Sequence, residues 1–225
     1  IQVIDKYGKM TKEAGADYEN LGTKDAREKI VENLQKQGLI EKIEDYNLRI
    51  SKCYRCNSII EPQISKQWFL KMKELSKMAI DSVKKGNVKF HPKKWEKIYF
   101  DWMKNIKDWC ISRQIWWGHK IPLDGVDDVL DTWFSSALWP FATLGWPEKT
   151  KDMKEFYPTQ VISTDRDIIN LWVARMIFSS MELTKKKPFG DVIIHPTILT
   201  HDGKRMSKSL GTGIDPMVLI EKYGA

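Results

Sequence analysis

Residues 159–196, TQVISTDRDIINLWVARMIFSSMELTKKKPFGDVIIHP, contain the pattern that decides the fold. Two short apolar runs, at 159–164 and 191–196, are typical of buried strands. The stretch between them is apolar nearly all round at helical spacing, as expected of a helix in a large core. A strand, a long helix and a second strand form a βαβ unit. We therefore predict an α/β fold with a doubly wound parallel sheet.

The stretch HDGKRMSKSLGTGIDP, residues 201–216, directly follows the second predicted strand. Ligands of open parallel sheets bind beyond the carboxyl ends of the strands, so a substrate is expected here. A charged run is often only a solvated loop, but glycines also allow backbone amides to approach a polyphosphate closely. The usual phosphate-cradling sequence G-x-x-x-x-G-K-[ST] is absent from the chain. The cations and hydroxyls of the loop are Lys204, Arg205, Lys208, Ser207 and Ser209.

The sequence outside these two stretches predicts short strands and helices in alternation. Thr23 is placed to cap a helix over 25–37 that Gly38 can end. Short strands are expected near residues 2–4 and over 39–44, and helices over 65–85 and from Pro92 to about 109. Asp215 and Pro216 are a good N-cap and first residue for a last helix.

The composition of the 225 residues, 42% hydrophobic and 30% charged, is that of a globular protein. Its apolar runs are shorter than the roughly 20 residues of a membrane span, and we expect no membrane association and no signal peptide. The net charge of +7 fits a nucleic-acid partner without requiring one. Both ends of the chain look cut from something longer, so we interpret the sequence as a fragment.

Several segments together resemble class I aminoacyl-tRNA synthetases, and among these the valine-specific members. RMSKS at 205–209 is similar to the KMSKS signature of that class, with Arg205 in place of the first lysine. Further segments match in the same order along the chain, so the resemblance covers nearly all of it. They are 53–72, 111–122, 128–148, 167–178 and 205–216.

The resemblance implies the second half of a Rossmann-type catalytic domain, with the tail of an inserted editing domain. Residues 1–50 would be the C-terminal remnant of that editing domain. Residues 51–200 would be the second catalytic half with the return connector, and 201–225 the KMSKS-type loop and the start of the next helix. The HIGH signature, which holds ATP together with KMSKS, is missing from the chain. We therefore expect the 225-residue chain alone to be inactive.

The implied reaction is activation of valine by ATP, with Mg, to valyl-adenylate, and transfer of valine to tRNA(Val). Positioning and electrostatic stabilisation supply most of such catalysis. Lys208 would stabilise the transferring phosphate, with Lys204 and Arg205 as supporting cations. The parent protein is expected to be a cytoplasmic monomer. The resemblance and the position of His195 at a strand end imply the ATP-binding set Lys208, Ser207, Ser209, Asp167 and His195.

The implied amino-acid pocket consists of Trp133, Ile168 and Trp172. Ile168 and Trp172 are four apart and would share a helix face, which core packing alone would also explain. In the family, the positions of Trp133 and Trp172 wall the side-chain pocket, and the Asp167 position faces the adenylate. Such a wall rejects isoleucine but not threonine, a limit for which valine-specific synthetases are a standard illustration. Editing of mischarged threonine by the parent enzyme is therefore expected.

The chain departs from the family pattern at two places. Asp165 stands where a glycine is expected, which adds a carboxylate close to the predicted adenylate site. Only LDGV, residues 123–126, occupies a place where the family usually carries a longer excursion.

The three cysteines favour a reducing compartment over a disulfide framework. Cys53 and Cys56 have the C-x-x-C spacing of half a zinc site, and zinc needs four ligands. Within this chain the simpler interpretation is that Cys53 and Cys56 are two free thiols. The family often carries the partner cysteines upstream of the editing domain, so zinc in the parent protein stays open. Cys110 is most simply a buried residue.

Two other functions remain open at this point. One is a sibling synthetase for isoleucine or leucine, although 132–140 and 167–172 favour valine. The other is a non-catalytic RNA-binding module that retains the synthetase fold.

Overall fold

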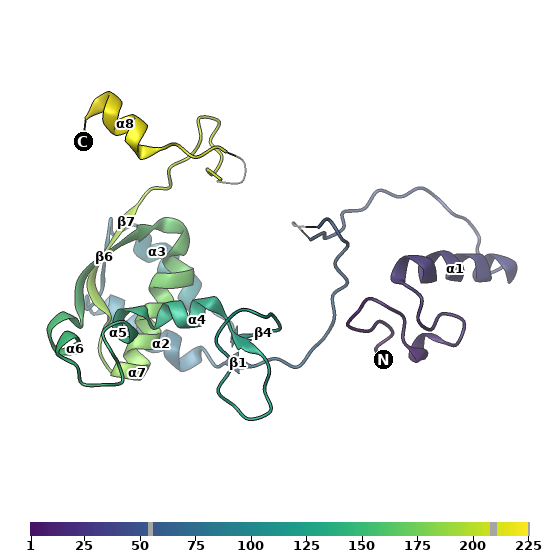
Figure 1. The fold of residues 1–225 in the computed structure, drawn as a ribbon, viewed down its shortest axis with the longest axis horizontal. Coiled ribbons are helices and arrows are strands. Elements are labelled where there is room, and N and C mark those ends of the chain that lie inside the picture. The colour runs from purple at the N-terminus through teal and green to yellow at the C-terminus, as the bar shows by residue number, and fades with distance from the viewer. Residues whose placement is uncertain (54–55, 208–210, 225) are drawn as a thin grey trace. The chain divides into compact units, whose positions relative to one another are not determined.

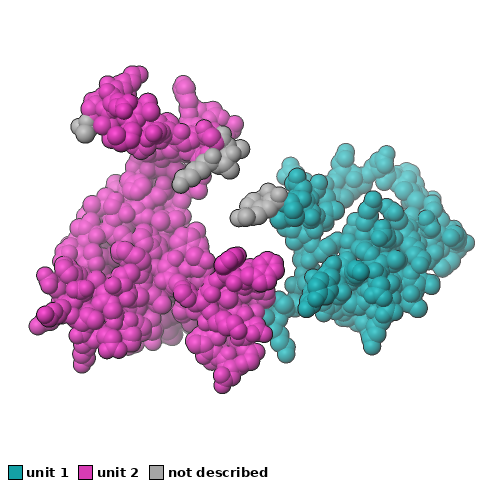
Figure 2. All heavy atoms as spheres, in the orientation of Figure 1, with its two compact units in different colours: residues 1–66 teal, residues 67–225 magenta. Residues whose placement is uncertain are grey.

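The computed structural model describes residues 1–53, 56–207 and 211–224. The chain forms two compact units, unit 1 from Ile1 to Lys66 and unit 2 from Gln67 to Ala225 (Figure 2). The assignment of residues 1–50 to an editing domain stays a prediction, as do the other two predicted segments.

Unit 1 contains the 3₁₀ turn Lys12–Ala14 and the helix α1, Thr23–Lys36. The predicted helix is confirmed, but Gly22 occupies the N-cap and Thr23 is already helical. Gly38 follows the helix with a φ of +66°, a conformation that glycine adopts without strain. The strand expected over 39–44 does not form, because no described segment pairs with it.

Unit 2 is built on a three-stranded parallel sheet (Figure 1). Strand β7, Phe189–His195, lies between β2, Lys89–His91, and β6, Thr159–Asp165. β6 and β7 pair in parallel from Thr159 opposite Phe189 to Asp165 opposite His195. The predicted α/β fold with a parallel sheet is therefore confirmed.

The connection between β6 and β7 is less regular than the sequence predicts. It begins with the 3₁₀ turn Arg166–Ile168 and continues as a π-helical turn, Ile169–Val173. Only then does the α-helix α7, Ala174–Thr184, start. A single π-helical turn is rare and often occurs at a functional site.

The core of unit 2 lies between the sheet and three helices: α7, α2 (Lys73–Lys84) and α3 (Trp95–Lys104). Helix α2 begins eight residues later than predicted, because Phe69–Leu70 forms strand β1 and pairs with β3, Trp109–Cys110. Helix α3 likewise ends before β3. The largest fully buried side chains of the core are Tyr99, Phe90, Phe178, Phe189, Met72 and Met103.

The remaining elements surround this core. Strand β4, Ser112–Arg113, pairs antiparallel with β5, Val129–Leu130, and residues 123–126 form the tip between them. The helices that follow are α4 (Thr132–Ala137), α5 (Trp139–Ala142), α6 (Lys151–Phe156) and α8 (Pro216–Tyr223). The Asp215 side chain accepts a hydrogen bond from the amide of Met217, which confirms the predicted N-cap of α8. None of the helices in the described part of the chain is long and apolar enough to cross a membrane.

Ile193 and Ile194 provide a matched test of how β7 faces the core. They are neighbours in the strand, but Ile194 is 5% exposed and Ile193 is 45% exposed. We expect Ile194→Ala to lower the free energy of unfolding by about 2–5 kcal/mol, because it leaves a cavity. Ile193→Ala should cost about 1 kcal/mol, since half of its side chain is already in water. Guanidinium denaturation followed by tryptophan fluorescence measures both losses, and equal losses would contradict this orientation.

Candidate functional site

The parallel pairing places the carboxyl ends of β6 and β7 side by side, at Asp165 and His195. Asp165 Oδ1 accepts a hydrogen bond of 2.8 Å from the amide of Asp167, which caps the 3₁₀ turn. Asp165 Oδ2 accepts a second bond of 2.6 Å from the hydroxyl of Thr197. The carboxylate that departs from the family pattern therefore joins the turn after β6 to the segment after β7.

Asp167 is the predicted adenylate-facing residue, and its side chain is 32% exposed. Its carboxylate forms an ion pair with Arg166, with 3.4 Å between Nε and Oδ1. It also forms an ion pair with Arg205 of the predicted KMSKS-type loop. The structure thus brings two predicted site residues together, from positions almost forty residues apart.

The segment from Leu199 to Arg205 forms a small hairpin. Leu199 and Arg205 form an antiparallel bridge, and the amide of Thr200 donates to the carbonyl of Lys204 at 2.8 Å. Gly203, with a φ of +77°, makes the turn. Lys204 Nζ lies 2.8 Å from Asp202 Oδ2, and Lys204 and Thr200 together lower the pKa of Asp202. Lys204 therefore forms an exposed ion pair within its own hairpin.

The other described residues of the loop lie on either side of positions 208–210 in the sequence. The amide of Ser207 donates to Thr212 Oγ1 at 2.8 Å, and the amide of Thr212 donates to the carbonyl of Ser207 at 3.2 Å. Lys208 and Ser209 lie outside the described residues. The exposed His195 has its Nδ1 3.1 Å from the carbonyl of Pro196. It stays a predicted neighbour of the ATP site.

The predicted amino-acid pocket residues come from two neighbouring elements. Trp133 lies on α4, whereas Ile168 ends the 3₁₀ turn and Trp172 lies in the π-helical turn. All three are partly buried. The indole Nε1 of Trp172 donates to the carbonyl of Ser136 on α4 at 3.0 Å, which ties the two elements together. Their role as the walls of a valine pocket stays a prediction.

A buried carboxylate, Asp131, fixes the start of α4. Asp131 is 6% exposed, and its Oδ1 accepts a bond of 3.3 Å from the amide of Trp133. Its Oδ2 accepts a bond of 3.0 Å from Trp109 Nε1 and lies 3.1 Å from Arg113 Nη2. The carboxylate thus connects α4 with strands β3 and β4, and holds the backbone of Trp133.

A second buried charge, Arg175, lies on α7 beside this carboxylate. Arg175 is 9% exposed, and its guanidinium carbon lies 4.1 Å from the centre of the Trp109 ring and 6.0 Å from that of Trp133. Burial lowers the pKa of Arg175, while the negative charge of Asp131 raises it. Stacking on tryptophan compensates part of the cost of burying the cation.

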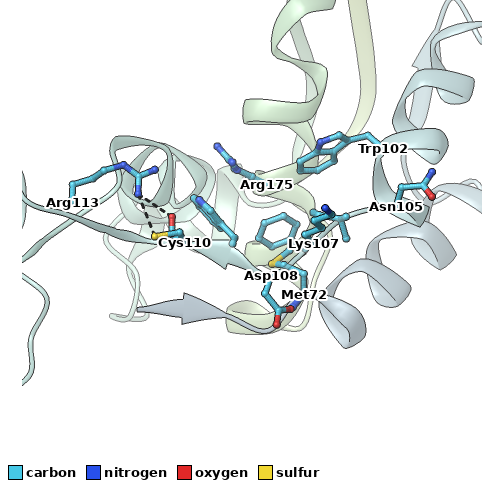
Figure 3. A pocket seen from close by; sticks show the side chains of 11 residues that line it. Met72, Trp102, Asn105, Lys107, Asp108, Cys110, Arg113 and Arg175 are labelled. Atoms are coloured by element: carbon cyan, nitrogen blue, oxygen red, sulfur yellow. Dashed lines mark hydrogen bonds between the residues drawn. The ribbon is translucent and has the colours of Figure 1, made fainter. Parts of the chain in front are cut away.

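Arg175 borders a cavity of about 460 Å³ (Figure 3). Trp109 and Phe178 also line it, and Arg113 lies over Cys110 at one side. Arg113 Nη1 donates to the carbonyl of Cys110 at 3.0 Å. The predicted ligand residues are not among those that line this cavity.

The two cysteines of the C-x-x-C pair both lie in unit 1. The amide of Asn57 donates to the carbonyl of Cys53 at 2.9 Å, and the Ser58 hydroxyl lies 3.3 Å from the sulfur of Cys56. Among the described residues there is no cluster of three or more His, Cys, Asp or Glu side chains that could hold a metal ion. A zinc site at this pair, which would need four ligands, stays a prediction.

The sequence analysis missed Asp131, Arg113 and Arg175. A signal for Arg175 was present, because it is the only charge in the apolar stretch 168–181 and a buried charge needs compensation. Which partner supplies that compensation depends on how α7 packs against α4 and β3.

The sequence matches the family described as tRNA synthetases class I (I, L, M and V) over residues 5–125 and 123–225. The chain belongs to this class I tRNA synthetase family.

Curated relatives of this synthetase chain are valine–tRNA ligases. The protein from Clostridium tetani is 50% identical over 240 residues, which cover 95% of this chain and 27% of that protein. The protein from Thermotoga maritima is 47% identical over 252 residues, which cover 100% of this chain and 29% of that protein. The chain thus spans less than a third of the length of these relatives.

Solved synthetase structures share the fold. Mycobacterium tuberculosis methionyl-tRNA synthetase in complex with methionyl-adenylate superposes with a TM-score of 0.63 at 18% identity. The match covers 78% of this chain and 34% of that one. The free form of the same enzyme superposes with a TM-score of 0.60.

The two stretches of the family match meet at residues 123–125, inside the short joint noted in the sequence. In the structure these residues form the tip between β4 and β5. The amide of Ile121, before the tip, donates to the carbonyl of Asp128, after it, at 3.0 Å. The short joint is therefore compatible with the pairing of β4 and β5.

Removal of the Asp131 carboxylate should destabilise unit 2 strongly. Asp131→Ala leaves the Trp109 indole without its acceptor and removes the negative charge beside the buried Arg175, at an expected cost of about 3–5 kcal/mol in the free energy of unfolding. Asp127→Ala is the matched control, because Asp127 is 99% exposed and pairs with Lys120 at the surface. It should change the free energy by about 0.5 kcal/mol or less. Similar losses in both variants would contradict the role of Asp131.

The reactivity of Cys56 should depend on pH near neutrality. Hydrogen bonds from Ser58, and a weaker one from Cys53, lower the pKa of Cys56 to about 7. The thiolate is the reactive form, so in metal-free protein the alkylation rate should rise with pH through a midpoint near that value. Ser58→Ala should raise the midpoint. Mass spectrometry of the iodoacetamide-labelled peptide gives both midpoints, and identical values would show that Ser58 does not stabilise the thiolate.

Proposed function

We propose that this chain is part of a valine–tRNA ligase, which activates valine with ATP and transfers it to tRNA(Val). The observation that carries the proposal is the 45–50% identity to curated valine–tRNA ligases over nearly the whole chain. The matched region includes the segments that contain Trp133, Ile168 and Trp172. The structural match to a methionyl-adenylate complex supports the fold of an adenylate-forming enzyme.

In the proposed reaction, the valine carboxylate attacks the α-phosphorus of ATP and pyrophosphate leaves. Lys208 stabilises the charge on the transferring phosphate, with Lys204 and Arg205 as supporting cations. Ser207, Ser209, Asp167 and His195 complete the ATP site. The position of the loop beyond the ends of β6 and β7 supports this assignment, since ligands of parallel sheets bind there.

Mg enters this proposal with the nucleotide. Mg²⁺ usually keeps several waters and binds substrate phosphates through one or two carboxylates. Zinc at Cys53 and Cys56 would need two further ligands from other parts of the protein.

Several assignments belong to the complete protein. We assign residues 1–50 to the end of an editing domain that removes mischarged threonine, and 51–200 to the second half of a Rossmann-type catalytic domain. Residues 201–225 carry the KMSKS-type loop. The complete enzyme is proposed to be a cytoplasmic monomer. The 225-residue chain alone should not charge tRNA, and detectable charging by it would contradict these boundaries.

The amino-acid specificity is tested by ATP–pyrophosphate exchange with the full-length protein. We expect faster exchange with valine than with isoleucine, because the tryptophan walls exclude the extra methylene of isoleucine. Faster exchange with isoleucine would contradict the proposal. No exchange with valine, isoleucine or leucine would favour a non-catalytic module.

Lys208→Ala in the full-length protein tests the catalytic lysine. We expect kcat for exchange to fall by about a hundred- to a thousandfold, with the KM for valine little changed, because the lysine acts on charge that develops in the transition state. Lys154→Ala, on the exposed face of α6, is the matched control and should keep the normal rate. An unchanged rate in Lys208→Ala would show that the loop is not catalytic.

A further inference from the structure

Two carboxylates at the end of β6 hold both ends of the segment that leads into the catalytic loop. Asp165 binds the hydroxyl of Thr197 at the start of this segment, at 2.6 Å. Asp167 forms an ion pair with Arg205 at its end. The segment 197–205 is therefore attached to the turn after β6 at two points.

The segment between these two points is internally braced. Thr200 Oγ1 lies 2.5 Å from Asp202 Oδ1 and 2.9 Å from the carbonyl oxygen of Lys204, and it accepts a hydrogen bond from the amide of Lys204 at 3.0 Å. The amide of Gly203 donates to the carbonyl of Thr200 at 2.9 Å. Leu199 and Arg205 pair at the base of this hairpin, so a displacement of Thr197 can reach Arg205, which precedes Lys208 by three residues in the sequence.

Asp165 controls the base of the hairpin and the turn at the same time. Its Oδ1 accepts from the amide of Asp167 at 2.8 Å, while its Oδ2 accepts from Thr197. Asp165 and Thr197 are both only partly exposed, and hydrogen bonds to a carboxylate are stronger than neutral ones. A glycine at position 165 could make neither side-chain bond.

We propose that Asp165 is a positioning residue that sets the 197–205 hairpin, which ends at Arg205, against the turn bearing Asp167, through its hydrogen bond to Thr197. This inference rests on the proposed function, because it assigns a role in valine activation. Asp165 does not touch the substrate in this role. It acts through Asp167 on one side and through the 197–205 hairpin on the other.

The test is a double-mutant cycle in the full-length protein, read by valine-dependent ATP–pyrophosphate exchange. Thr197→Val should lower kcat by about tenfold, the rate equivalent of one lost charge-assisted hydrogen bond. Asp165→Ala should lower kcat at least as much, because it also removes the bond to the Asp167 amide. The double variant should lose no more than Asp165→Ala alone, and not the product of the two single losses that independent effects would give. The KM for valine should stay unchanged, because the loop acts on the phosphate.

Rescue and control variants separate positioning from general damage. Thr197→Ser keeps the hydroxyl and should retain kcat within about twofold. Thr143→Val and Asp152→Ala change the same residue types at exposed positions, directly after α5 and on α6, and should have normal kcat. Counting active sites by the adenylate burst removes any contribution from unfolded protein.

The possible outcomes are distinguishable. Additive losses in the double variant, or failure of Thr197→Ser to restore kcat, would overturn the positioning role while wild-type exchange with valine upheld the proposed function. A wild-type protein without valine-dependent exchange would refute the proposed function itself, and the inference with it.

Discussion

The parallel pairing of β6 with β7 is the constraint on which the site depends. Parallel neighbours cannot be joined by a tight turn, so the chain must cross over through residues 166–188 before it returns. The crossover brings two carboxyl ends to one edge of the sheet, where Asp165 and His195 are partners. The turn after β6 and the hairpin after β7 therefore begin at the same place, which allows Asp167 to reach Arg205.

Charges buried beside the crossover hold the neighbouring elements in register. Asp131 and Arg175 are almost completely buried, next to the indole of Trp109. Such charges are costly unless hydrogen bonds and opposite charges compensate them, so they tolerate few alternative arrangements. The same carboxylate caps α4, and Trp172 binds the backbone of that helix. The position of the predicted amino-acid pocket thus depends on electrostatics as well as on apolar packing.

Local patterns predicted the elements whose causes are local. The two strands of the βαβ unit were recognisable because their apolar runs are short and continuous, and the cap at Asp215 because it involves residues two apart. The strand expected over 39–44 does not form, since an apolar run becomes a strand only when a partner is present. The helix expected from residue 65 starts later because a strand partner is present there. Strand β3 pairs with Phe69–Leu70, which are therefore extended and not helical.

For the site, the sequence by itself determined the chemistry: the cations of the KMSKS-type loop, its place after a βαβ unit, and the resemblance to valine-specific class I synthetases. Only the tertiary structure decided which residues meet. Asp165, which the sequence alone left as a departure from the family pattern, is hydrogen-bonded to Thr197. Asp131 contacts Trp109 and Arg113 and caps the start of α4. The physical reason is that hydrophobic periodicity and helix capping depend on residues that are close in the sequence. The partner of a carboxylate thirty residues away is fixed only when strands and helices have packed.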